Sequence, residues 1–190
     1  MVYKIADVGD IDATLTLHAK YQIDSIKEED KKDGFVTTTF SKAELTALIE
    51  KEQGLFIAKD GDRVIAYVMA ASWAFWSQWA MFAFMIEELP TLSYKGQRLN
   101  TQNSYQYGPI CIDKELRGGA VLREIFSFSL KHMAKRYPIL VTFVNKINPR
   151  SYAAHTRKLG LEVLQEFSYN GNDYWELVCE TRRWNCHLNN

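Results

Sequence analysis

The stretch that decides the fold is residues 107–122, which read YGPICIDKELRGGAVL. It predicts a strand to about Ile112, a turn at Gly118–Gly119, and a helix that begins near Val121. Two adjacent glycines allow positive φ angles, and the first N–H groups of a helix have no partner within it. Several N–H groups can therefore point at one phosphate, assisted by the helix dipole and the charge of Arg117. The same pattern also fits a strand-to-helix turn without a ligand.

The strand that leads into this turn contains Gly108 and Pro109. Proline has no N–H group, so it removes one hydrogen bond from a strand ladder. We therefore expect pairing with the neighbouring strand to be interrupted here, at a place where a ligand could enter. The helix after the turn has apolar residues at three- and four-residue spacing and is expected to end before Pro138.

Residues 112–120 resemble the acetyl-CoA signature of the GNAT N-acetyltransferase superfamily, written Arg/Gln-x-x-Gly-x-Gly/Ala and commonly Arg-Gly-x-Gly-x-Gly. Arg117 and Gly118 match this motif, while Ala120 stands at its second glycine and Leu122 at its third. This resemblance implies that the turn binds the pyrophosphate of acetyl-CoA.

A second segment, residues 148–161, resembles the family motif Asn-x-x-Ala/Ser-x-x-x-Tyr/His-x-Lys-x-Gly-Phe, with one additional residue before Gly160. The two motifs occur in the family's order, separated by a helix and a strand. The resemblance covers about Leu55 to Glu180. It implies an α/β (α+β) fold of GNAT type, with a mixed, mostly antiparallel seven-stranded sheet flanked by helices.

Local patterns along the chain are consistent with this fold. Two residue pairs predict the starts of helices: Ser41 and Glu44 form a capping box, and Asn148 precedes Pro149. Asp10 or Asp12 is expected to cap a helix that runs towards residue 21. The expected strands are 2–6, 55–59, 63–72, the strand that ends near 112, 139–144, 161–169 and 174–180.

Composition limits the classes of function. The chain has 190 residues, 47% of them hydrophobic and 24% charged, which predicts one domain, residues 1–190. Lys plus Arg equals Asp plus Glu at 23 each, so we expect a small ligand and neither nucleic acid nor membrane as a partner. Cys111, Cys179 and Cys186 lack zinc-site spacing, and residues 1–7 lack the apolar core of a signal peptide. No metal and a cytoplasmic location are expected.

One segment could be read as a membrane span, because no charged residue occurs from Val64 to Ile86. We expect a strand and helices instead, since Trp73, Trp76 and Trp79 lie in the middle of the segment and the turn at 60–62 makes Arg63 onward a strand. Its aromatic residues are interpreted mainly as core. In the GNAT arrangement this connection lies on the acceptor side of the sheet, so they could also line an acceptor pocket.

The expected cofactor site combines backbone and side-chain groups. Backbone N–H groups of residues 117–122 are expected to bind the pyrophosphate, and the resemblance implies that residues 110–112 pair with the pantetheine arm and that one of their amides polarises the thioester carbonyl. Cys111 is interpreted as a small buried hydrophobic residue and not as a nucleophile. The full set is Ile110, Cys111, Ile112, Arg117, Gly118, Gly119, Ala120, Val121, Leu122 and Asn148.

The expected catalytic residues are Tyr152 and His155, which share one face of the second motif's helix. His155 stands where the family places a tyrosine that protonates the leaving thiolate. Counting back from Gly160 gives Thr156 instead, and His155 could equally be a packed histidine without a catalytic role. No general base can be named among Glu28, Glu29 and a chain of waters.

Together these features predict an acetyl-CoA-dependent N-acetyltransferase that acts on a small amine or on an exposed protein amine. A homodimer is kept as an option for its assembly. The alternative is a catalytically weak GNAT-like module that binds CoA or a protein partner, because Ala120 and Leu122 replace two motif glycines and the family's tyrosine is missing.

Overall fold

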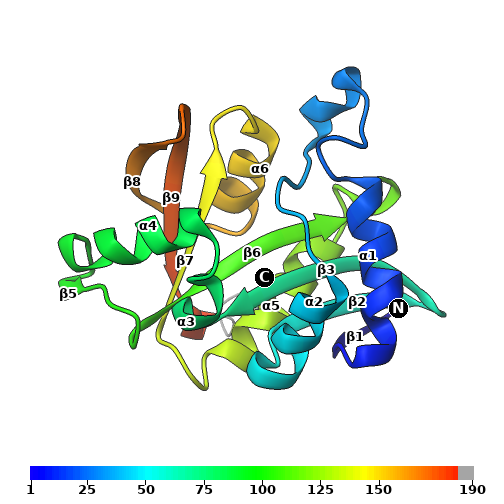
Figure 1. Cartoon of the computed structure of the whole chain (residues 1–190), viewed down its shortest axis with the longest axis horizontal. Helices are drawn as coiled ribbons and strands as arrows, with labels where there is room; N and C mark the ends of the chain where they lie inside the picture. Colours follow the sequence, from blue (N-terminus) through cyan, green and yellow to red (C-terminus); the bar gives the residue numbers. More distant parts are fainter. Residues whose placement is uncertain (184–190) are drawn as a thin grey trace. The chain divides into compact units, whose positions relative to one another are not determined.

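The structure is a computed structural model that describes residues 1–183. Among these residues, seven strands form one sheet in the order β1-β2-β3-β6-β7-β9-β8, and helices flank it (Figure 1). β6 and β7 are parallel, whereas the pairs β1–β2, β2–β3, β7–β9 and β8–β9 are antiparallel. The predicted fold class, a mixed and mostly antiparallel seven-stranded sheet flanked by helices, is confirmed.

The described chain divides into two compact units. The first holds Met1–Ala70 and Gly108–Ser129, and the second holds Ala71–Tyr107 and the described residues from Leu130 onward. The division falls within β6 and within α5, so both elements contribute residues to both units. The expectation of a single domain stays a prediction.

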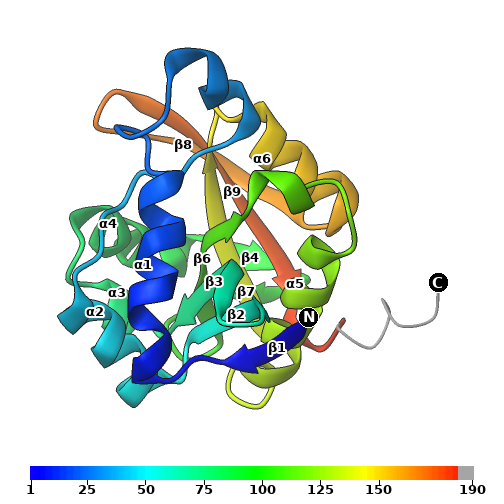
Figure 2. The ribbon, with the colours of Figure 1, turned by 90° about the vertical axis from the view of Figure 1, so that its right-hand side faces the viewer.

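The first unit contains the amino-terminal strands and the two helices between them. In Figure 2, α1 lies against β2 and β3, and the Tyr67 hydroxyl of β3 donates to Nδ1 of His18 on α1 at 2.6 Å. β2 and β3 are almost entirely buried, as expected for apolar strands within a sheet. The strands are β1 (Val2–Ile5), β2 (Leu55–Asp60), β3 (Arg63–Ala71) and the second half of β6 (Ser104–Ile112). The helices are α1 (Ile11–Lys20), α2 (Lys42–Ala47) with a π-helical extension Leu48–Glu52, α5 (Val121–Met133), and 3₁₀ turns at Val8–Asp10, Glu28–Asp33 and Lys114–Leu116.

Two local features of this unit fix how α2 leads into β2. Ser41 and Glu44 form the predicted capping box, with the Ser41 N–H donating to the Glu44 carboxylate at 2.7 Å and the Glu44 N–H to the Ser41 hydroxyl at 3.2 Å. Gly54 then lies against β3 so closely that a Cβ atom would be 2.0 Å from the Ala70 carbonyl oxygen. Only glycine allows this approach.

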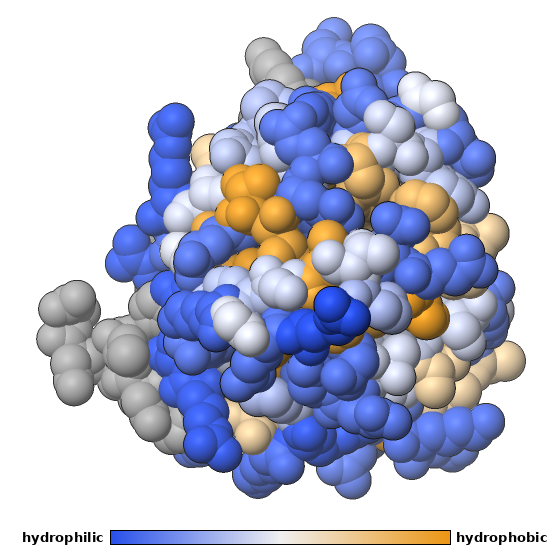
Figure 3. Space-filling model, turned by 90° about the vertical axis from the view of Figure 1, so that its left-hand side faces the viewer, coloured by the Kyte–Doolittle hydropathy of each residue, from blue (hydrophilic) through white to orange (hydrophobic). Residues whose placement is uncertain are grey.

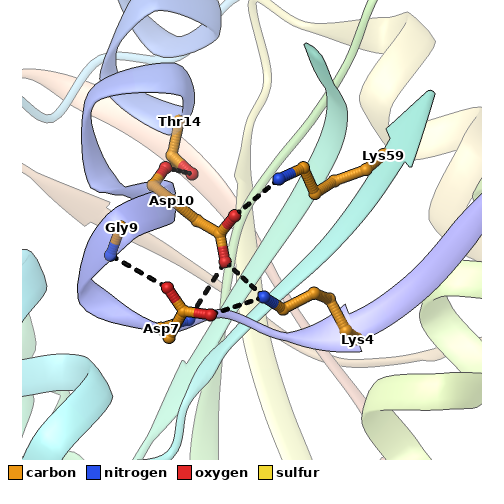
Figure 4. A network of polar contacts seen from close by, with 6 residues as sticks. All are labelled: Lys4, Asp7, Gly9, Asp10, Thr14 and Lys59. Carbon is orange, nitrogen blue, oxygen red and sulfur yellow. Dashed lines mark hydrogen bonds and ion pairs between the residues drawn. The ribbon is translucent and has the colours of Figure 1, made fainter. Parts of the chain in front are cut away.

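Asp10 has a different role from the helix cap that the sequence pattern predicts. It is the residue before α1, but its side chain makes no capping hydrogen bond. Its buried carboxylate instead binds Lys4 at 2.7 Å and Lys59 at 2.9 Å, and Asp7 provides the cap for the preceding turn (Figure 4). Burial alone would raise the pKa of Asp10, but the hydrogen bonds from the two lysines outweigh it, so the pKa is lowered. The network ties β1, α1 and β2 together.

The second unit contains the rest of the sheet and its covering helices. Its strands are the first half of β6, β7 (Ile139–Asn145), β8 (Glu162–Tyr169) and β9 (Asn172–Glu180), with a separate short pair β4 (Ser93–Tyr94) and β5 (Gln97–Arg98). Its helices are α3 (Trp73–Trp76), α4 (Ala80–Glu88), α6 (Pro149–Ala153) with a π-helical extension Ala154–Lys158, and a 3₁₀ turn at Leu89–Thr91.

Helices cover both faces of the sheet in this unit. On one face Phe82 of α4 contacts Phe143 of β7 with ring centroids 5.7 Å apart. On the other, Tyr152 of α6 stacks on Trp175 of β9 at 4.1 Å. Four apolar residues of α4 are only half-buried. Figure 3 shows the side where α4 lies, and hydrophobic residues are gathered there among hydrophilic ones. The four residues are Met81, Ala83, Phe84 and Ile86.

The uncharged run from Val64 to Ile86 forms β3, α3 and part of α4 and not one continuous helix. Within residues 1–183, every helix is too short or too polar to span a bilayer.

Replacing Asp10 with asparagine should lower the free energy of unfolding by about 1–3 kcal/mol, because the buried carboxylate that holds two lysines loses its charge. The matched control is Asp12→Asn, whose ion pair with Lys42 is exposed at both ends. It should change stability by less than about 0.5 kcal/mol. Urea denaturation of both variants measures the difference, and equal losses would show that the Asp10 network does not stabilise the first unit.

Candidate functional site

In the first unit, the predicted glycine turn joins the end of β6 to the start of α5. The N–H groups of Arg117 and Gly119 donate within the turn, at 3.3 and 3.4 Å. None of the hydrogen bonds in the described part of the chain uses the N–H groups of residues 118, 120, 121 or 122. Residues 118–120 are exposed. Four backbone donors are therefore available at the amino terminus of a 13-residue helix.

Gly118 gives the turn its shape. Its φ is +94°, and a Cβ atom there would meet nothing within 4 Å, so the backbone conformation and not crowding requires glycine. At Gly119 a Cβ atom would lie 3.5 Å from the Leu116 carbonyl oxygen, which is ordinary contact. Alanine therefore fits at position 119.

The turn is anchored to the end of α1 by the buried carboxylate of Asp113. Tyr21 donates its hydroxyl to Asp113 at 3.0 Å, and Lys20 binds the same carboxylate at 3.1 Å. The Tyr21 hydroxyl oxygen accepts the N–H of Lys114 at 2.6 Å. Burial alone would raise the pKa of Asp113, but the hydrogen bonds from Lys20 and Tyr21 outweigh it and the pKa is lowered. The carboxylate is thus charged at neutral pH.

Arg117 belongs to the same cluster. Its Nε donates to the Ile112 carbonyl at 2.8 Å, and its guanidinium lies over the Tyr21 ring at 4.4 Å from the centroid. A cation in this position adds positive potential beside the turn.

The structure places Ile110, Cys111 and Ile112 at the end of β6, after the parallel ladder with β7. That ladder pairs residues 104–106 with 139–141, and Gly108 and Pro109 follow it. The Cys111 thiol is buried, and burial raises its pKa to about 12. A thiol with this pKa stays protonated and is a poor nucleophile. Cys179 is buried as well, and Cys186 lies outside the described residues.

In the second unit, Asn148 starts α6 as predicted. Its side-chain oxygen accepts the N–H of Ser151 at 3.0 Å, and Pro149 occupies the first helical position. The helix ends at Gly160, whose φ is +67°.

His155 lies on this helix with 4% of its surface exposed. Its Nδ1 donates to the Ser151 carbonyl at 2.8 Å, since a carbonyl oxygen can only accept. Burial lowers the pKa of His155, although the hydrogen bond to Ser151 acts in the opposite direction. The ring is therefore neutral at pH 7, with its single proton on the nitrogen that faces the backbone.

Tyr152 lies one turn earlier on the same helix and is only half-buried. Its ring stacks on Trp175 at 4.1 Å, which orients the side chain. α6 thus carries one neutral, buried histidine and one more accessible phenol, while Thr156 donates its hydroxyl to the Tyr152 carbonyl at 2.8 Å.

Of the aromatic residues between β3 and β4, Trp73 and Trp76 are fully buried. The indole N–H of Trp76 donates to the Gln106 carbonyl at 3.3 Å. Trp79 is half-buried and contacts Trp76 at 5.3 Å. The interpretation as core fits Trp73 and Trp76.

Sequence reasoning missed two buried polar residues of the second unit, Gln106 on β6 and Glu176 on β9, each 1% exposed. Glu176 interrupts the apolar part of its strand, and this was the one local signal that could have identified it.

No family model and no curated protein sequence matches the chain. Among solved structures, its fold is similar to a GNAT superfamily phosphinothricin acetyltransferase from Sinorhizobium meliloti in complex with AcCoA. The TM-score is 0.63, with 16% identity over 94% of this chain and 87% of that one. It is also similar to yncA, a putative acetyltransferase from Salmonella typhimurium with its cofactor acetyl-CoA, at a TM-score of 0.62 and 13% identity over 95% and 93% of the two chains.

A third similar structure is a ribosomal-protein-alanine N-acetyltransferase from Brucella melitensis. Its TM-score is 0.61, with 14% identity over 95% of this chain and 99% of that one. At these identities the similarity establishes the fold, which is that of the GNAT acetyltransferases.

The neutral state of His155 makes stability depend on pH. Its folded pKa lies below the ordinary value of about 6.5, so on acidification the unfolded chain binds a proton first and the free energy of unfolding falls. The slope should reach at most about 1.4 kcal/mol per pH unit until the folded pKa is passed.

Urea denaturation between pH 7.5 and 5 should show that the free energy of unfolding declines less steeply in His155→Gln than in the wild type. The half-buried His132 offers a control, because His132→Gln should reduce the slope less. An unchanged slope in His155→Gln would contradict the neutral, buried state.

Proposed function

We propose that this chain is an acetyl-CoA-dependent N-acetyltransferase. The observation that carries the proposal is the turn between β6 and α5, with four backbone N–H donors free of acceptors among the described residues. Such donors at a helix start favour a phosphate, and the helix dipole adds to the attraction. Acetyl-CoA carries a pyrophosphate, and two of the similar structures were solved with acetyl-CoA.

The other groups proposed to bind the cofactor lie at the end of β6 and at the start of α6. Backbone groups of Ile110, Cys111 and Ile112 lie beyond the β6–β7 ladder, where they would pair with the amides of the pantetheine arm. One of these N–H groups would polarise the thioester carbonyl. Asn148 uses its side-chain oxygen for the helix cap, so its amide nitrogen is the group that would reach a ligand.

Tyr152 is the better candidate of the two for protonating the leaving thiolate. A general acid must release its proton to the reacting group, and His155 holds its proton against the Ser151 carbonyl. The phenol of Tyr152 carries its own proton and is more accessible. In this assignment His155 packs within the helix and supports the position of Tyr152.

The alternative, a module that binds CoA without turnover, is favoured by Ala120 and Leu122 at two motif glycine positions. Both alternatives require CoA binding. Release of free thiol from acetyl-CoA in the presence of primary amines separates them, because a binding module would release none.

Gly119→Asp and Ala120→Asp should abolish CoA binding, because each places a carboxylate beside the N–H groups that would hold the pyrophosphate. Gly119→Ala and Ala120→Asn are the matched controls, since alanine fits at position 119, position 120 is exposed, and neither change adds charge. Calorimetry with CoA should show at least a tenfold loss for the aspartate variants and a small change for the controls. Pantetheine, which lacks the pyrophosphate, should bind all five proteins equally. Unchanged CoA affinity in the aspartate variants would refute the phosphate site.

Tyr152→Phe should lower kcat by about a hundredfold or more and leave CoA affinity nearly intact, because it removes the proton of the proposed acid. His155→Gln should reduce kcat by less. The reverse order would assign the acid to His155. If neither substitution affects turnover, solvent protonates the thiolate and α6 has no acid role.

A further inference from the structure

Among the buried side-chain oxygens of the second unit that have no hydrogen-bond partner among the described residues are Oε1 of Glu176 and Oε1 of Gln106. The other oxygen of Glu176 accepts from the Gln165 side chain at 2.7 Å. The Gln106 side-chain nitrogen donates to the Tyr107 carbonyl at 2.7 Å, which leaves its oxygen as the free group. Buried polar groups are nearly always paired, so two unpaired acceptors call for an explanation.

Both acceptors lie on one face of the sheet. Glu176 is directly opposite Phe143 of β7, and residues opposite each other on paired strands share a face. Gln106 is opposite Val141, which is two residues before Phe143 and therefore on the same face. By strand spacing, the Cα atoms of Gln106 and Glu176 are about 12 Å apart, which their side chains can shorten.

This face is the one that α3 and α4 cover. Phe143 contacts Phe82 of α4 at 5.7 Å and Tyr174 of β9 at 5.6 Å. The indole N–H of Trp76 on α3 reaches the backbone of Gln106. Both acceptors thus lie on a face of the sheet that aromatic rings cover.

The charges around Glu176 make the site attractive to a cation. The neighbouring groups are Gln165 on β8, Phe143 on β7, Tyr174 on its own strand, and Glu88 on α4, which adds a second negative charge. No lysine or arginine forms a salt bridge with Glu176 among the described residues. A buried carboxylate without a cation is costly, and an ammonium ligand would compensate it.

We propose that Glu176 binds the acceptor as an ammonium and takes up one of its protons, with Gln106 as a second acceptor, and that the acceptor is a primary amine on an apolar or aromatic body. This assignment rests on the proposed function. It supplies the base that the sequence did not identify and narrows the class of acceptor.

The protons balance as follows. One ammonium proton moves to the Glu176 carboxylate and leaves a neutral amine, whose nitrogen attacks the thioester carbonyl carbon. The C–N bond forms, the C–S bond breaks, and the thiolate takes a proton from Tyr152. The second N–H proton leaves the nitrogen after attack and restores Tyr152 through solvent, and Glu176 releases its proton to solvent. The net products are the amide, free CoA and one proton.

The acidity of Glu176 suits this role. Burial and the neighbouring Glu88 raise the pKa of Glu176 and the hydrogen bond from Gln165 lowers it, which together bring the pKa to about 7. A base with a pKa near the working pH transfers protons most effectively. An ordinary primary ammonium has a pKa near 10.4; burial lowers this pKa, whereas the carboxylate of Glu176 beside the ammonium raises it.

The test compares 2-phenylethylamine with 2-phenylethanol, a neutral ligand of similar shape. Glu176→Gln keeps the shape and removes the charge. It should weaken 2-phenylethylamine binding at least tenfold by calorimetry and leave 2-phenylethanol and CoA affinities unchanged. With acetyl-CoA, kcat/KM for 2-phenylethylamine should fall about a hundredfold. The rise of kcat/KM through about pH 7 should disappear, because that rise reports ionisation of Glu176.

Glu180→Gln is the matched control. Glu180 lies at the end of β9 with an exposed side chain paired to Lys95, so its loss should change neither binding nor rate. Glu176→Gln should also have a urea midpoint at pH 8 no lower than the wild type, because it removes a buried charge. This excludes unfolding as the cause of lost activity. Gln106→Met should weaken 2-phenylethylamine binding by a smaller factor.

The outcomes separate this inference from the proposed function. Binding of 2-phenylethylamine that depends on Glu176, with no thiol release, would refute the acetyltransferase and leave the amine site standing. Thiol release that is equal in wild type and Glu176→Gln would refute the role of Glu176 and leave the acetyltransferase standing. Equal losses of amine and alcohol binding, or a wild-type chain that does not bind 2-phenylethylamine, would overturn the inference.

Discussion

The buried carboxylate of Asp113 holds together the parts of the first unit on which the candidate phosphate site depends. It binds Lys20 and Tyr21 at the end of α1, and Tyr21 in turn holds the N–H of Lys114 and the guanidinium of Arg117. The Asp113 carboxylate therefore links the end of β6, the end of α1 and the glycine turn. A turn fixed in this way needs little rearrangement when a ligand binds, which saves the free energy of ordering it.

The buried polar groups of the chain fall into two kinds. Asp10, His18 and Asp113 have partners for their polar atoms, and each joins elements that are distant in sequence. Gln106 and Glu176 each keep one oxygen without a partner. A fully satisfied group is explained by stability, whereas an unsatisfied one lowers stability and calls for another explanation. Burial alone would not have distinguished the two kinds.

Sequence patterns predicted the strands, the helices and the glycine turn because these depend on neighbouring residues. The capping box at Ser41 and the helix start at Asn148 are examples. Asp10 was misjudged because its carboxylate binds Lys59, 49 residues further along the chain. Glu176 was missed for a related reason: the pairing of β9 between β7 and β8 and the cover of α4 bury it. Local spacing also placed His155 correctly on its helix, but not its burial or its proton.

The turn after β6 offers main-chain N–H groups, which every amino acid except proline possesses. Side chains at positions 119, 120 and 122 can therefore change over evolutionary time while the donors stay in place. The information that specifies the turn is concentrated in the positive φ of Gly118 and in the anchor at Asp113. The shape of the turn therefore requires glycine at one position, and its free N–H donors do not depend on which side chains follow.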